Sequence, residues 1–323
     1  MRVLIAPDSF KGTYTAVEVA RAIAAGVREA GGQPVELPVA DGGEGTMSAV
    51  ASTTGATLHS VQVTNPWGAP VTAEYAITRD GTAVVELAQA SGITVQHDGA
   101  RDAFTADTYG TGQVIVDAIK HGARRILVSA GGSATSDGAE GAIRAIEEAG
   151  GLAGVPITVL TDVTTPFERA GEVFGPQKGA DPETVERITA RLRDQAAALP
   201  RNPLGVARTG AAGGFSGGMW GRYDAELVSG AEYVLDFVDF DHAVAQADVV
   251  VVGEGRLDSQ TGEGKIIDAI LNRVNSVRPG LPVVAVVGSV DEDLGAYREN
   301  FADVIVATDA ERMRAAGLRI ASS

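Results

Sequence analysis

The sequence contains no cysteine, and it has only four histidines in 323 residues. Without cysteine there are no disulfides, no thiolate catalysis and no zinc sites with cysteine ligands. The histidines are scattered, and no two of them have the spacing of metal ligands, so we expect structural or surface roles for His59, His97, His121 and His242.

Aromatic residues make up only 5% of the chain, and no apolar run approaches the roughly 18 residues of a membrane span. The apolar stretch after Met1 is too short for a signal peptide and is typical of a first strand. The net charge of −16 disfavours nucleic acid as a partner. We therefore predict a cytoplasmic protein that binds neither nucleic acid nor a membrane.

Lysine is scarce, with four residues, whereas glycine is abundant, with 41. Lys11, Lys178 and Lys265 each adjoin a glycine, while Lys120 is typical of a helix C-terminus. A lysine is a point charge on a long stem, and glycine lets a ligand approach the backbone closely, a combination that suits phosphate. Chance adjacency in a glycine-rich chain is the alternative.

Short apolar runs alternate with helical patterns at both ends of the chain, which is typical of parallel α/β units. Thr15 with Glu18 predicts a capping box at the start of a helix. The strands predicted in these two segments are Arg2–Ala6, Pro34–Val39, Asp248–Val252, Pro282–Val287 and Asp303–Val306. We predict one Rossmann-like, doubly wound domain from residues 1–58 plus 232–323.

The middle of the chain has a different pattern of predicted strands and helices. Short β segments at Thr57–Thr64, Val71–Thr78 and Thr82–Leu87 are separated by turn signals, which indicates antiparallel or mixed pairing. Helix and strand then alternate again, and Asp181 before Pro182 predicts the start of a long helix. We predict that residues 59–231 form an inserted α/β domain with a mixed sheet.

Glycine-rich loops follow several predicted strands, at Asp41–Thr46, Gly131–Gly138 and Gly253–Asp258. Ligands of open α/β sheets gather at the carboxyl ends of strands, where helix N-termini favour phosphate. A P-loop that includes Lys265 would need glycine at position 259 and a hydroxyl residue at position 266, where the chain has Ser259 and Ile266. A dinucleotide motif that begins at Gly253 would need glycine at position 258, where the chain has Asp258. The sequence thus excludes a P-loop NTPase and disfavours an NAD enzyme.

Seven acids lie at or just after predicted strand ends: Asp8, Asp41, Glu44, Asp137, Asp162, Glu254 and Asp258. Phosphoryl transfer needs Mg²⁺ held by carboxylates, and it can use a carboxylate to orient or deprotonate the attacking hydroxyl. Each acid alone is more often a cap or a turn former. The glycine-dense segment 210–218 has two interpretations, a phosphate cradle or a hinge between domains.

Eight segments in order along the chain resemble the bacterial glycerate kinase family, the two-domain type that is neither P-loop nor actin-like. They include Ala6–Gly12, Ala40–Thr46, Thr108–Gly112, Gly131–Gly138, Asp162–Thr164, Val173–Ala180, Gly210–Gly214 and Gly253–Gln260. The resemblance implies ATP- and Mg²⁺-dependent phosphorylation of D-glycerate, usually to 2-phosphoglycerate. It also implies a Rossmann-like domain split around an inserted one.

Chemistry rather than the resemblance guides the assignment of roles. We predict catalytic roles for Asp8, Lys11, Asp41 and Asp258. The predicted Mg²⁺ ligands are Glu44, Asp137, Asp162 and Glu254. The predicted contacts to substrate or phosphate are Ser9, Gly42, Gly43, Gly131, Gly132, Ser133, Lys178, Gly210, Gly213, Gly214, Arg256 and Lys265.

The chain departs from the family pattern in its middle. It is shortened between Gly151 and Ile157, and Thr165 replaces the asparagine that is usual there. An acceptor other than glycerate, such as another hydroxy acid, polyol or cyclitol, is therefore an alternative. A non-catalytic metabolite-binding regulator is a weaker one, and we expect a monomer or a homodimer.

Overall fold

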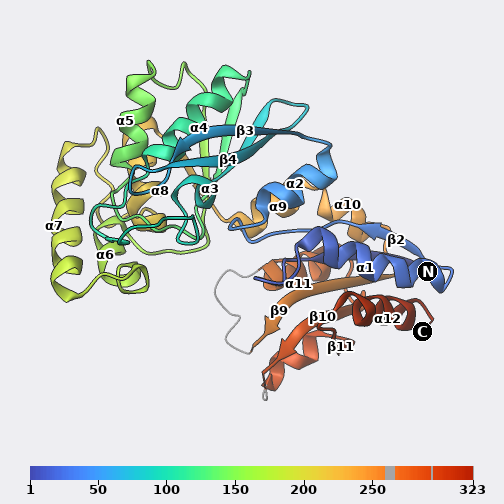
Figure 1. Cartoon of the computed structure of the whole chain (residues 1–323). Coiled ribbons are helices and arrows are strands. Elements are labelled where there is room, and N and C mark those ends of the chain that lie inside the picture. Colours follow the sequence, from blue (N-terminus) through green and yellow to red (C-terminus); the bar gives the residue numbers. More distant parts are fainter. Residues whose placement is uncertain (259–265, 292–293, 323) are drawn as a thin grey trace. The chain divides into compact units, whose positions relative to one another are not determined.

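The computed structural model describes residues 1–258, 266–291 and 294–322 (Figure 1). The chain divides into two compact units, each built on its own sheet. The first unit comprises Met1–Asp41, Ser48–Thr54 and Gly230–Ser323, and the second comprises Gly42–Met47 and Gly55–Ser229. One sheet is parallel and the other is mixed, which confirms the predicted fold class.

The first unit contains a five-stranded parallel sheet in the order β11-β10-β9-β1-β2. The strands are β1 (Arg2–Pro7), β2 (Gln33–Glu36), β9 (Val249–Leu257), β10 (Val283–Val290) and β11 (Asp303–Val306). Counted within the unit, this is the doubly wound order 2-1-3-4-5. Right-handed crossovers from β1 to β2 and from β9 to β10 leave in opposite directions, so their helices cover opposite faces.

Strand β9 corrects the sequence prediction, which ended the strand at Val252 and placed a loop at Gly253–Asp258. The strand continues to Leu257 because β10 pairs with it along this stretch, with Val286 opposite Gly253 and Val290 opposite Leu257. The two glycines in this stretch therefore belong to a strand, where they allow close backbone approach.

The helices of the first unit are α1 (Ala16–Glu29), α9 (Gly230–Phe237), α10 (Phe240–Ala245), α11 (Ile266–Val277), η3 (Gly295–Asn300) and α12 (Ala310–Ala321), with most of α2 (Thr46–Thr54). The predicted capping box of Thr15 and Glu18 is confirmed at the start of α1. Helices α1 and α12 share one core with the sheet. They approach closely at glycine, since a Cβ on Gly317 would lie 2.0 Å from the Ile23 carbonyl oxygen.

The second unit contains a six-stranded sheet in the order β3-β4-β5-β6-β7-β8. The strands are β3 (Thr57–Thr64), β4 (Pro70–Ile77), β5 (Thr82–Glu86), β6 (Arg125–Ser129), β7 (Ile157–Leu160) and β8 (Glu226–Val228). The first three pair antiparallel and the rest pair parallel, which confirms the mixed pairing predicted for this part of the chain.

The helices of the second unit are α3 (Leu87–Ser91), α4 (Tyr109–Lys120), α5 (Glu140–Glu148), η1 (Phe167–Arg169), α6 (Ala170–Phe174), η2 (Pro176–Lys178), α7 (Pro182–Ala198) and α8 (Ala211–Tyr223). Asp181 caps α7 as predicted, accepting from the Thr184 amide at 2.8 Å. No helix within residues 1–258, 266–291 and 294–322 is long and apolar enough to cross a bilayer.

Candidate functional site

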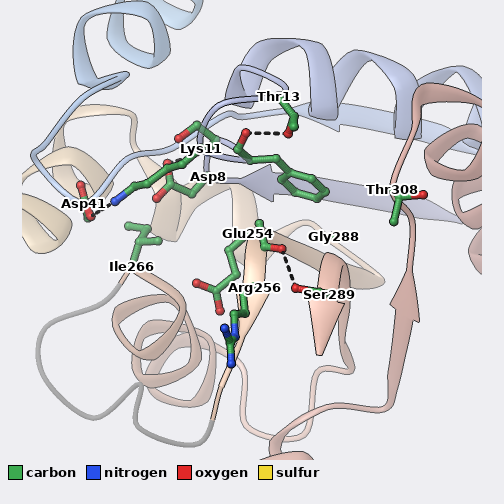
Figure 2. A pocket seen from close by; sticks show the side chains of 13 residues that line it. Asp8, Lys11, Thr13, Asp41, Glu254, Arg256, Ile266, Gly288, Ser289 and Thr308 are labelled. Atoms are coloured by element: carbon green, nitrogen blue, oxygen red, sulfur yellow. Dashed lines mark hydrogen bonds and ion pairs between the residues drawn. The ribbon is translucent and has the colours of Figure 1, made fainter. Parts of the chain in front are cut away.

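A cavity of about 530 Å³ lies in the first unit, where β1 and the paired strands β9 and β10 approach their carboxyl ends (Figure 2). It is lined by Asp8, Ser9, Phe10, Lys11, Thr13, Asp41, Glu254, Gly255, Arg256, Ile266, Gly288, Ser289 and Thr308. The structure thus brings together six residues that the sequence predicted for the site: Asp8, Ser9, Lys11, Asp41, Glu254 and Arg256.

The strand order explains why the cavity lies at this place. Strand β1 lies between β2 and β9, and the crossovers from β1 and β9 run in opposite directions. The loops that follow these two strands therefore diverge and leave a crevice between them, as in other doubly wound sheets. The amide of Asp8 donates to the Gly253 carbonyl at 2.8 Å, so both strands are joined at the edge of the cavity.

Asp8 is the buried acid of this cavity, with 7% of its surface exposed. Burial raises the pKa of its carboxyl to about 7, and repulsion from Asp41 adds to the shift. The Ser9 amide donates to Asp8 Oδ1 at 2.6 Å, and this contact opposes the rise only in part. A carboxylate whose pKa lies near neutrality is suited to accept a proton from a hydroxyl.

Lys11 and Asp41, which also line the cavity, form an ion pair (Figure 2). Lys11 Nζ lies 3.9 Å from Asp41 Oδ2, and the two side chains are 73% and 32% exposed. Exposed pairs of this kind contribute little to stability. Lys11 can therefore turn toward an anionic ligand at little cost.

Glu254 and Arg256 belong to β9 and are two residues apart, so they project from the same face of the strand. Arg256 Nε donates to Asp291 Oδ1 at 2.9 Å, and Nη2 contacts the same oxygen. This pair uses one edge of the guanidinium, and Nη1 could bind a further acceptor such as a carboxylate.

The acids of the cavity fit a magnesium ion. In the described part of the chain, no three histidine or acidic residues form a preassembled metal site. Mg²⁺ needs fewer protein ligands, because one or two carboxylates together with phosphate oxygens and water complete its shell. Asp41 and Glu254 line the same cavity, and the repulsion between Asp8 and Asp41 would fall when a cation binds there.

Two glycine loops meet in the second unit. A Cβ on Gly131 would lie 2.8 Å from Gly43 Cα, so the loop after β6 packs directly on the loop that contains Gly42 and Gly43. Gly132 has a φ of +70°, and its carbonyl accepts from the Ile93 amide at 2.8 Å. This packing holds the two loops together within the unit.

Lys178 lies inside the second unit with 8% of its surface exposed. Its Nζ donates to the Thr135 carbonyl and, at 3.3 Å, to the Ser133 hydroxyl. Burial lowers the pKa of this amine to about 7, and the nearby Asp137 opposes the shift only in part. Lys178 thus supports the loop after β6 from inside, and direct contact with phosphate remains a prediction for it and for Ser133.

Three predicted metal ligands belong to the second unit. Asp137 is buried, and its Oδ2 accepts from the Thr108 amide and hydroxyl and from the Gly141 amide, so it joins the N-termini of α4 and α5. Asp162 Oδ1 accepts from the Ser229 hydroxyl at 2.8 Å. Glu44 is exposed. Their predicted metal-binding roles are not tested by these contacts.

The glycine-dense segment 210–218 lies mostly within helix α8, and the predicted phosphate contacts of Gly210, Gly213 and Gly214 stay predictions. Ala212, Gly213 and Gly214 form a left-handed turn inside α8, with φ values of +50°, +67° and +90°. A Cβ on Gly213 would lie 2.0 Å from the Thr135 carbonyl oxygen, and one on Gly210 would lie 2.5 Å from the Pro166 carbonyl oxygen. Close backbone packing therefore explains these glycines.

Glu86 is a candidate that the sequence prediction missed. It is the last residue of β5, is 4% exposed, and its Oε1 accepts from the amides of Gly45 and Met47, both at 2.9 Å. The available signal was a charged residue within the apolar run Val84–Leu87, since such residues are rarely buried without partners.

Two further predicted site residues are Asp258 and Lys265. Asp258 lies directly after β9 and is partly buried. Lys265, a predicted phosphate contact, lies outside the described residues.

Comparison with known proteins gives consistent results. The family model described as "Glycerate kinase family" matches residues 3–149 and 146–318. The chain is 34% identical to the glycerate 2-kinase of Escherichia coli strain K12, over 94% of this chain and 90% of that protein. It is 35% identical to the glycerate kinase of Bacillus subtilis strain 168, over 94% and 89% of the two chains.

A solved structure agrees with these relatives. The crystal structure of a protein assigned as glycerate kinase 2 from Salmonella typhimurium LT2 superposes with a TM-score of 0.86 at 34% sequence identity. The match covers 99% of this chain and 97% of that one.

Proposed function

The chain belongs to the glycerate kinase family, and from this premise we propose that it transfers the terminal phosphoryl group of ATP to D-glycerate in a Mg²⁺-dependent reaction. The proposed acceptor is the hydroxyl on carbon 2, which gives 2-phosphoglycerate and ADP. The observation that carries the proposal is the cavity in which the buried Asp8, with a pKa of about 7, lies with Lys11 and Arg256.

Asp8 is the proposed base. As the acceptor oxygen bonds to the terminal phosphorus, the bond from that phosphorus to the bridging oxygen of ADP breaks, and the hydroxyl proton passes to the Asp8 carboxylate. Lys11 would pair with phosphate oxygens. Arg256 would bind the carboxylate of glycerate and hold its hydroxyl in reach of Asp8.

Asp41 and Glu254 are the proposed ligands of Mg²⁺ in this cavity. When bound, the ion supplies positive charge that neutralises phosphate oxygens during transfer. The chain's own contribution is to orient these carboxylates at the carboxyl end of the sheet, on the loop after β2 and on the rigid strand β9.

A coupled assay of ADP release tests the function directly. With D-glycerate, ATP and Mg²⁺ we expect turnover that stops when chelator removes the metal, and phosphorus NMR should identify 2-phosphoglycerate as the product. No turnover by folded protein across a panel of hydroxy acids and polyols would refute the kinase proposal.

A different small acceptor is the second candidate function. The family model matches in two segments that overlap at residues 146–149, immediately before the region between Gly151 and Ile157 that the family resemblance indicates as shortened. Residues 149–156 connect α5 to β7 there. Comparison of kcat/KM across the acceptor panel decides, since a cyclitol or another hydroxy acid that outperforms D-glycerate would replace it as the substrate.

We expect the substitution Arg256→Gln to raise KM for D-glycerate by about 10–100-fold, because it removes a charged hydrogen bond to the acceptor carboxylate. KM for ATP and kcat should stay near the wild-type values. The matched control is Arg28→Gln, which removes another exposed arginine paired with an acid, Glu36, in the same unit. An equal rise in both Michaelis constants would contradict the assignment of Arg256 to the carboxylate.

A further inference from the structure

Helix α2 receives its N-terminal cap from a distant part of the chain. The helix has no acidic residue in its first turn, and the Thr46 hydroxyl donates to the Gly43 carbonyl. The amides of Gly45 and Met47 instead donate to Glu86 Oε1, about 40 residues further along the chain, both at 2.9 Å. Carboxylates at helix N-termini are stabilised by these N–H groups and by the helix dipole.

The position of Glu86 makes this contact rigid. Glu86 ends β5 and lies opposite Ser129 of β6, so its backbone is held in the sheet. Its side chain is buried, and burial raises the pKa of its carboxyl, with a smaller contribution from repulsion by Glu44. A buried carboxylate is costly unless it is hydrogen-bonded, and the two amides satisfy this requirement.

The loop that Glu86 holds is the segment Gly42–Met47. It is supported from two neighbouring strands, because Glu86 binds it from the end of β5 while Gly131, just after β6, packs on Gly43. Gly42 and Gly45 adopt the left-handed region, with φ values of +87° and +96°, so the loop follows a path that other residues rarely adopt.

Glu86 also changes what the loop can offer to a ligand. The N-terminus of α2 would otherwise be a ready anion site, but two of its amides are already bound to a carboxylate. The group that the loop exposes is the side chain of Glu44, a predicted Mg²⁺ ligand.

We propose that Glu86 is a positioning residue: by capping α2 it holds the Gly42–Met47 loop in the conformation in which Glu44 is presented to the metal–nucleotide substrate. This inference rests on the proposed function, since it assumes Mg²⁺ and ATP as ligands. Glu86 would touch neither; its carboxylate acts on the loop through the amides of Gly45 and Met47, and it also has a hydrogen bond with the Gln89 side chain.

Three variants and one control test the inference. Glu86→Ala removes the acceptor, Glu86→Asp retracts the carboxylate by one methylene, and Glu86→Gln keeps an acceptor oxygen in place. The control is Asp181→Ala, which removes a carboxylate cap from α7 in the same unit without touching this loop. All four should be compared with the wild-type protein at one temperature and pH.

In hydrogen–deuterium exchange, we expect the amides of Gly45 and Met47 to exchange at least tenfold faster in Glu86→Ala and Glu86→Asp. Calorimetric titration of MgADP should show about tenfold weaker binding in these two variants, and the Mg²⁺ concentration for half-maximal turnover should rise equally. Glu86→Gln should remain within about threefold of wild type, and Asp181→Ala should change only the melting temperature.

Two outcomes would overturn the inference. One is a Glu86→Ala or Glu86→Asp protein that binds MgADP as tightly as Asp181→Ala does. The other is faster exchange of the loop without any change in MgADP binding. If Glu86→Ala fails to fold, Glu86→Asp decides alone. Absence of wild-type turnover with D-glycerate would refute the proposed function instead, and the exchange and calorimetry would still decide the role of Glu86.

Discussion

Replacement of Asp8 by asparagine should reduce kcat for D-glycerate phosphorylation by about 10²–10⁴-fold, the usual contribution of a general base. Asparagine has nearly the same shape and keeps an acceptor for the Ser9 amide, so KM for ATP and for glycerate should change little. Steady-state kinetics of ADP release measures both parameters. A variant that retains more than a tenth of wild-type kcat would exclude Asp8 as the base.

The pH dependence of the wild-type enzyme should show the same group. A base must be ionised to accept a proton, and the pKa of Asp8 is raised to about 7 by burial and by Asp41. We therefore expect kcat to fall by about tenfold for each pH unit below 7 and to level off above it. The residual kcat of Asp8→Asn should not show this fall below pH 7.

The same substitution should stabilise the folded protein at neutral pH. A carboxyl whose pKa is about 7 when folded and near 3.8 when unfolded binds more protons in the folded state between these values. The free energy of unfolding of the wild type therefore falls as pH rises from about 4 to about 7. Asp8→Asn should remove this loss and gain about 4 kcal/mol at pH 8, since a pKa difference of one is worth about 1.4 kcal/mol, but nothing at pH 3.5.

Asp80 provides a control, because its replacement should change stability at pH 8 in the opposite direction. Hydrogen bonding from Thr78 lowers the pKa of its carboxyl, so its contribution to stability is present above the unfolded pKa and is lost in acid. Asp80→Asn should therefore lower the melting temperature at pH 8, whereas Asp8→Asn should raise it. Melting temperatures of both variants at pH 3.5 and pH 8 complete the comparison.

Replacement of Gly213 by alanine should destabilise the protein by about 3–5 kcal/mol, the sum of the left-handed backbone cost and overpacking. Gly213 has a φ of +67°, and its new Cβ would lie 2.0 Å from the Thr135 carbonyl oxygen and 2.5 Å from Ser136 Cα. Backbone atoms cannot move aside as a side chain can. Denaturant titration measures the loss.

Ala212, directly before it, is the matched control. It is a non-glycine residue with a φ of +50°, so Ala212→Gly should stabilise the protein by about 0.5–1 kcal/mol. A loss of stability in Gly213→Ala together with a gain in Ala212→Gly is the result that a left-handed turn at these two positions predicts. Equal losses at both positions would contradict its presence within α8.

Local sequence patterns determine much of this fold. The capping box of Thr15 and Glu18 and the cap at Asp181 follow from the sequence alone because capping depends on residues three positions apart. The parallel ends and mixed middle followed from apolar periodicity and turn residues. Asp8 and Asp41 were recognised as site candidates because each follows a predicted strand.

Only the tertiary structure decided the features that depend on distant partners. Strand β9 extends to Leu257 because β10 pairs with it, and no signal within residues 253–257 indicates that partner. The close packing of Gly213 on the Thr135 carbonyl and of Gly210 on the Pro166 carbonyl depends on distant residues, so the local sequence does not indicate it.

Dependence on distant partners also decides which role each acidic residue has. The sequence by itself determined that this chain is an α/β member of the glycerate kinase family with carboxylates at its strand ends. Whether a carboxylate lines the cavity like Asp8, joins two helices like Asp137 or caps α2 like Glu86 depends on burial and on donors from distant residues. These are properties of packing, and sequence spacing does not contain them.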